Sequence, residues 1–141
     1  MGKFLGAFLC VLTIGASSAH AVDQRLVGRW YGLELAPGEA HCWISERKSD
    51  GSYRTDFITQ DGQDFNSYYQ QGTWSATDQS FATIIQSESG TPVPPNRIEY
   101  TIVRVGPREL VYRHQGSGSE FTVKKVNASF RLPAKCGKSG A

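Results

Sequence analysis

Long apolar runs, net charge and histidine are all scarce in this chain of 141 residues, and each scarcity excludes a class of protein. The longest apolar stretch, residues 4–14, is too short to cross a membrane as a helix, which takes roughly twenty residues. The formal net charge is only +2, and acidic and basic residues are interspersed, so no nucleic-acid partner is expected. No long helical pattern of apolar residues is present, which argues against an α-helical fold.

Catalytic and metal-binding patterns are missing as well. There are no paired carboxylates, no nucleophile beside a base and no phosphate-binding loop, so we expect neither an enzyme nor a bound cofactor. His114 has no carboxylate or nucleophile at a useful spacing, and His41 lies on a different predicted strand. A metal site needs further ligands of the right kind, so none is expected.

The first 21 residues have the features of a secretory signal peptide. Lys3 supplies the positive charge, residues 4–14 supply the apolar region, and Ala19-His20-Ala21 is a cleavage site of Ala-x-Ala form. Cleavage after Ala21 removes Lys3 and lowers the net charge from +2 to +1. We therefore expect a secreted or periplasmic protein of one domain.

Cysteine is also rare, and its positions predict one disulfide. Cys10 belongs to the predicted signal peptide, which leaves Cys42 and Cys136 as an even pair in an oxidising compartment. The alternative is a redox or metal pair, which is disfavoured because no further cysteine or histidine stands at ligand spacing. The expected bond is structural.

What the chain does contain is β-strand pattern. Clusters of turn-forming residues separate eight segments, most of which alternate apolar and polar side chains as half-buried strands do. Short connections join neighbours, so the strands predict an antiparallel meander that closes into an eight-stranded up-and-down barrel. The alternative is a two-sheet sandwich, for which only the proline-rich loop at residues 90–96 offers a crossover. The predicted strands span residues 27–35, 41–48, 53–60, 65–76, 81–87, 97–105, 109–115 and 120–126.

The predicted domain organisation follows from these segments. Residues 1–21 are the signal peptide, residues 22–126 the barrel, and residues 127–141 a polar tail on the barrel exterior. A disulfide to Cys136 in that tail requires Cys42 to face outward, and strand alternation then turns Trp43 inward.

The start of the first predicted strand resembles a known family. Gly28-Arg29-Trp30-Tyr31 is similar to the Gly-x-Trp-Tyr opening of the lipocalins and their calycin relatives, and residues 109–114 with 117–121 resemble small exported bacterial lipocalin-like proteins. The resemblance implies that Trp30 closes one end of the barrel and packs against an arginine. Arg131 is the better candidate and Arg113 the second. Avidin-type barrels share the same eight-strand meander.

Alternation places an aromatic-rich set of side chains inside the barrel. An eight-stranded barrel is just wide enough to be filled by side chains or to hold one small ligand. We predict that it holds a small, mostly apolar molecule at the end opposite Trp30. The alternative is a filled barrel that acts through its surface, as an inhibitor or as a protein partner in an envelope complex. The predicted ligand-binding residues are Trp43, Phe57, Tyr69, Tyr100, Tyr112 and His114, and the predicted inward set also includes Ile85, Ile102, Phe121 and Val123.

Overall fold

The computed structural model describes residues 22–136, so the predicted signal peptide and its cleavage site lie outside the described residues. Within that range, no helix has the length and apolar character needed to span a membrane. One short 3-10 helix precedes eight β-strands. The elements are η1 (Gln24–Leu26), β1 (Gly28–Ala36), β2 (Glu39–Arg47), β3 (Ser52–Asp61), β4 (Asp64–Ala76), β5 (Ser80–Glu88), β6 (Thr91–Val105), β7 (Glu109–His114) and β8 (Glu120–Val126).

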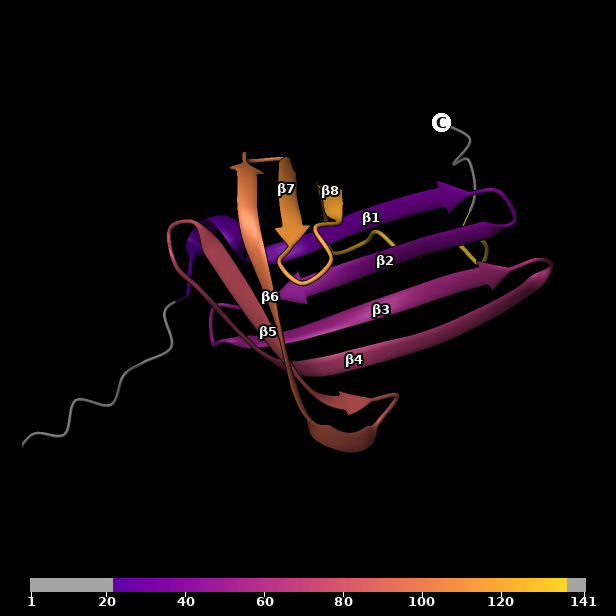
Figure 1. The fold of residues 1–141 in the computed structure, drawn as a ribbon, viewed down its shortest axis with the longest axis horizontal. Helices are drawn as coiled ribbons and strands as arrows, with labels where there is room; N and C mark the ends of the chain where they lie inside the picture. The colour runs from indigo at the N-terminus through magenta and orange to yellow at the C-terminus, as the bar shows by residue number, and fades with distance from the viewer. Residues whose placement is uncertain (1–21, 137–141) are drawn as a thin grey trace, which may run out of the picture.

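The eight strands form a closed barrel in chain order, as predicted, and not a two-sheet sandwich. Every strand pairs antiparallel with its neighbours in sequence. The last strand pairs with the first, where Arg29–Gly32 of β1 lie opposite Val126–Val123 of β8. Figure 1 shows β1 to β4 running side by side and the later strands crossing them to complete the ring. Closure gives each strand two neighbours, so the barrel has no free edge strand among the described residues.

Alternation decides which side chains enter the barrel. Trp30 of β1 lies opposite Ser45 of β2, and Trp74 of β4 lies opposite Thr83 of β5, so these four side chains share the inner face. The two indoles are fully or almost fully buried. Their N–H groups donate to backbone carbonyls, from Trp30 Nε1 to Leu26 (3.0 Å) and from Trp74 Nε1 to Lys48 (2.9 Å). Leu26 in η1 is itself fully buried, so this end of the barrel is closed by packed side chains.

The prediction of a long proline-rich loop at residues 90–96 is wrong, because β6 already begins at Thr91. Its first residues pair with β5, and the register then shifts so that Asn96 is the next partner on β6 after Pro92. The residues skipped by this shift include Pro94 and Pro95. A proline has no backbone N–H to donate to the neighbouring strand, so it is tolerated where a bulge interrupts the pairing.

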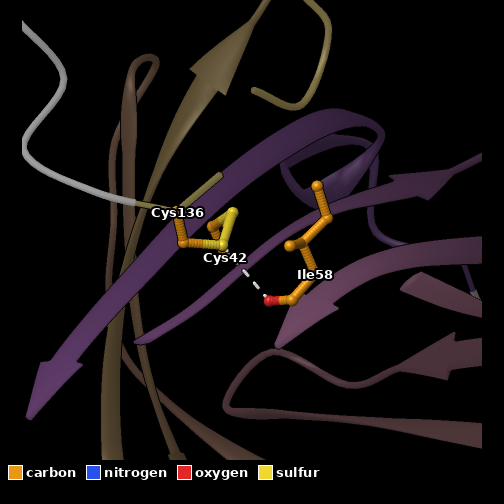
Figure 2. The surroundings of a disulfide bond; sticks show 3 residues. All are labelled: Cys42, Ile58 and Cys136. Atoms are coloured by element: carbon orange, nitrogen blue, oxygen red, sulfur yellow. Dashed lines mark hydrogen bonds between the residues drawn. A yellow bond between two sulfur atoms is a disulfide. The ribbon is translucent and has the colours of Figure 1, made fainter. Parts of the chain in front are cut away.

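The C-terminal tail is bonded to the outside of β2, as predicted. Cys42 and Cys136 form a disulfide with a Cα–Cα distance of 5.6 Å. Both cysteines are buried, in a small apolar cluster on the outer wall that includes Leu33 and Leu132. The Cys136 sulfur also lies 3.2 Å from the carbonyl oxygen of Ile58 (Figure 2, dashed line), although a disulfide sulfur has no proton to donate.

Two further contacts hold the tail where it leaves β8. Arg29 Nη1 donates to the carbonyl oxygens of Asn127 (2.5 Å) and Phe130 (3.0 Å). The Phe130 ring packs against Tyr31, with ring centroids 5.0 Å apart. The tail therefore covers the outer face of β1 and β2 from its first residues to the disulfide.

The basic partner of Trp30 differs from the one that the family resemblance implies. Lys125 of β8, which lies opposite Trp30 in the register, places its Nζ 5.3 Å from the centre of the indole. Arg131 is exposed and donates to carbonyl oxygens of its own turn, at Ala128 and Phe130. Arg113 pairs instead with Glu120 on the surface. Both arginine candidates are therefore wrong, because cross-strand pairing gives the place over Trp30 to a lysine.

Candidate ligand cavity

A cavity of about 160 Å³ lies inside the barrel. Glu34 and His41, which lie opposite each other on β1 and β2, line it and are also exposed to solvent. The cavity therefore reaches the surface at the end of the barrel that carries this pair, which we call the mouth. The full lining consists of Glu34, His41, Trp43, Ser45, Arg47, Tyr53, Thr55, Phe57, Gln70, Phe81, Thr83, Ile98, Tyr100, Tyr112 and Phe121.

Seven of the fifteen lining residues are aromatic, and four of the six predicted ligand-binding residues belong to this group: Trp43, Phe57, Tyr100 and Tyr112. The rings touch one another around the lumen. Tyr100 stacks on Phe81 at 4.8 Å between centroids and meets Tyr112 edge-on at 5.2 Å. Offset-stacked and edge-to-face contacts of this kind are the favourable arrangements of aromatic pairs, so they stabilise the packing of these rings.

Trp43 fits into the wall only because β1 has a glycine opposite it. Gly32 pairs with Trp43, and a Cβ atom built on Gly32 would lie 2.2 Å from the indole Cζ2. Two carbon atoms in contact normally stay about 3.5–4.0 Å apart. The missing side chain at Gly32 therefore makes the space that the indole occupies against the wall.

The structure places Tyr69 on the outer face of the barrel, so the prediction that it points inward is wrong. Tyr69 lies opposite Asp56, and the Arg54 guanidinium stacks over its ring at 3.9 Å. Its neighbour Tyr68 has the inward parity instead and stacks on Phe57, with ring centroids 4.8 Å apart, but it is exposed to solvent and does not line the cavity. Trp74 faces inward on the same strand, and Tyr68 is six residues before it, so alternation puts Tyr68 on the inner face and Tyr69 on the outer face.

His114 also lies outside the cavity lining. Its parity is the predicted one, since it pairs with Tyr100 at the end of β7. However, its Nδ1 is within 2.8 Å of Ser117 Oγ and accepts a hydrogen bond from the Ser117 backbone N–H at 3.0 Å. The imidazole is thus engaged in the turn after β7, and whether it contacts a ligand stays a prediction.

Arg47, which the sequence analysis did not select, is the most unusual residue of the cavity. Only 3% of its surface is exposed, and its Nε and Nη1 atoms find no hydrogen-bond partner among residues 22–136. The guanidinium carbon lies 4.7 Å from the centre of the Phe81 ring. The signal was present in the sequence, because counting by twos from inward-facing Trp43 gives Ser45 and Arg47.

Burial changes the acid–base properties of this part of the lumen. It lowers the pKa of the Arg47 guanidinium, while the nearby Tyr112, Tyr100 and Tyr53 phenols oppose that shift. Burial also raises the pKa of Tyr53 and of Tyr112 to about 12, so that both phenols are neutral at physiological pH. These phenols therefore act as hydrogen-bonding groups and not as counter-ions for Arg47.

The remaining polar lining is compact. Ser45 Oγ and Thr55 Oγ1 lie opposite each other on β2 and β3 and share a hydrogen bond of 2.8 Å. In the described part of the chain, no three His, Cys, Asp or Glu side chains are close enough to hold a metal ion together. The cavity thus combines aromatic walls, a few hydroxyl groups and one buried cation.

Comparison of the chain with protein-family models, with curated proteins and with solved structures finds no match.

Proposed function

We propose that the barrel is a carrier-like module that holds one small, mostly apolar molecule in its lumen. The observation that supports this is the aromatic-lined cavity of about 160 Å³ that opens at the mouth. Ligand sites are typically concave, mainly apolar and largely preformed, with a few polar groups that orient the ligand. The cavity is concave and preformed, and its seven aromatic side chains supply apolar surface beside polar groups that could orient a ligand.

The size of the cavity limits what it would hold. An apolar cavity of about 150 Å³ in another protein binds benzene, so the lumen here suits a molecule with a single ring or a short chain. Burial of apolar surface contributes about 25 cal/mol per Å², from which the costs of association are subtracted. A ligand this small therefore binds with modest affinity unless a polar contact adds to it.

A binding titration with toluene, an uncharged single-ring probe, tests the proposal. The indole N–H resonance of Trp43 should shift saturably, because this ring lines the cavity. Native mass spectrometry of the purified protein should in addition detect any small molecule that remains bound. A saturating amount of toluene that leaves the Trp43 resonance unchanged would count against a ligand-holding lumen.

Two matched substitutions on β6 separate the lumen from the outer surface. Ile98→Trp adds a large ring to the cavity wall and should abolish toluene binding. Val103→Trp adds the same ring at an exposed position, 45% accessible, and should leave binding unchanged. Equal loss in both variants, with both folded by circular dichroism, would contradict binding in the lumen.

We also propose that the protein lies outside the cytoplasm, in the periplasm or the extracellular medium. The disulfide between Cys42 and Cys136 supports this, because such bonds persist in oxidising compartments. Fractionation of cells that produce the full chain, followed by non-reducing peptide mapping, tests it. Oxidised protein outside the cytoplasm is the expected result, and reduced protein inside it would contradict the proposal.

A further inference from the structure

We propose that the ligand carries a carboxylate, and that the Arg47 guanidinium in the lumen binds it. This deepens the proposed function and depends on it. The ligand class is then a small carboxylic acid with an apolar body, such as a single-ring or short-chain acid.

The first argument is that Arg47 is an arginine without an anion. Its guanidinium takes part in no ion pair within residues 22–136, and two of its nitrogen atoms are buried without a hydrogen-bond partner. Five other arginines pair with a carboxylate at 2.5–2.9 Å; they are Arg25, Arg54, Arg97, Arg104 and Arg113. Each of those is substantially exposed, so the arginine that most needs a counter-ion is the one without it.

The second argument is that the lumen supplies no anion of its own. Glu34 is the only acidic side chain among the cavity-lining residues, and it is exposed at the mouth. Glu34 lies opposite His41 in the register of β1 and β2, whereas Arg47 is six residues further along β2. At the rise of a β-strand this separation is about 20 Å, too far for an ion pair. A negative charge brought by a ligand would therefore be the first close partner of the guanidinium.

The third argument concerns what surrounds the guanidinium. Its carbon lies over the Phe81 ring, and the Tyr53, Tyr100 and Tyr112 phenols are nearby. Arg47 and all four of these rings line the cavity, so a ligand that reaches this part of the lumen lies beside the guanidinium. A planar guanidinium matches a planar carboxylate with two parallel hydrogen bonds, and phenol hydroxyls donate to the same oxygens.

The comparison of benzoate with benzamide tests the inference, because the two differ in charge and hardly in size. Wild-type protein should bind benzoate at least tenfold more tightly than benzamide. Arg47→Met should abolish that preference while toluene binding persists. Arg54→Met is the matched control, since Arg54 also lies over an aromatic ring, Tyr69, but on the outer face, and it should keep the preference.

Each outcome separates the inference from the proposed function. Equal binding of benzoate and benzamide by wild-type protein overturns the carboxylate but leaves the ligand-holding lumen intact. If toluene, benzamide and benzoate all fail to bind, the proposal that the lumen holds a ligand is overturned. If Arg47→Met does not fold, a wild-type titration still decides, because the pKa of carboxyl-labelled benzoate should fall on binding. An unchanged or raised pKa would overturn the inference.

Discussion

Substitution of Gly32 by alanine is the most direct test of how the cavity wall is built. The new Cβ would lie 2.2 Å from Cζ2 and 2.3 Å from Cε2 of Trp43. Restoring an ordinary carbon–carbon contact requires a displacement of at least about 1.3 Å. The indole lines the lumen, so the space of about 160 Å³ is where it has room to move.

Two measurable effects follow from that displacement. Overpacking of a buried site costs typically 1–3 kcal/mol, and we expect urea denaturation of Gly32→Ala to show a loss in this range. Toluene binding should weaken as well, because the displaced ring enters the cavity. Gly106→Ala is the control: its Cβ would lie 3.7 Å from the nearest atom, an ordinary contact, and should change stability by less than about 0.5 kcal/mol.

A second substitution shows whether the clash is the cause. Trp43→Phe removes the atoms that meet the new Cβ, so the cost of Gly32→Ala should shrink in that background. A coupling free energy of about 0.5–3 kcal/mol is expected for residues in contact. Unchanged stability and unchanged toluene binding in Gly32→Ala would refute the account of the wall.

Three further predictions concern the tail, the lumen and the closed end. Replacing both Cys42 and Cys136 by alanine should lower the free energy of unfolding by about 2–5 kcal/mol, because the bond closes a long loop in the unfolded chain; a loss below 1 kcal/mol in urea denaturation would contradict this. Burial raises the pKa of Tyr112 to about 12 in the folded protein, whereas the same phenol has a pKa of about 10 in the unfolded chain. As the pH rises above about 10, the phenol therefore ionises in the unfolded chain first, and the free energy of unfolding falls. Wild type should lose about 2 kcal/mol more than Tyr112→Phe between about pH 9 and pH 11.5, and equal losses would count against a buried neutral phenol. Lys125→Ala should lower the free energy of unfolding by about 0.5–1 kcal/mol, because the contact with the buried indole is lost, whereas Arg131→Ala should lower it by less than about 0.5 kcal/mol. The reverse order in urea denaturation would show that Arg131, and not Lys125, is the basic partner of Trp30.

Strand alternation was sufficient to predict the barrel because most strands have one apolar and one polar face. It failed where the pattern is ambiguous or interrupted. Tyr68 and Tyr69 are adjacent and chemically identical, so only the inward parity of Trp74 decides which of them lies on the inner face of β4. The prolines at residues 92–95 predict a loop, but the register shift there forms a bulge that allows prolines inside a strand, so β6 begins before them.

The candidate site was predicted only as far as its aromatic wall. Arg47 follows Glu46 and precedes Lys48, and a run of charged residues normally indicates a solvent-exposed face. Its burial follows from the parity of β2, in which Cys42 faces outward to the disulfide while Trp43, Ser45 and Arg47 face inward. The family resemblance predicts an arginine as the partner of Trp30, whereas alternation along β8 from inward-facing Val123 leads to Lys125.

The closure between β1 and β8 has a consequence for the kinetics of folding. Each of the other strand pairs in the ring joins neighbours in sequence and can form as a local hairpin, in about 1–10 μs for an isolated one. The pairing of β1 with β8 is the exception, and its residues are almost a hundred positions apart. The disulfide joins β2 to the tail that follows β8, so in an oxidised chain the two sides of this seam are already tethered before they meet. Oxidised protein should therefore refold faster than reduced protein, with the difference confined to the step that completes the ring.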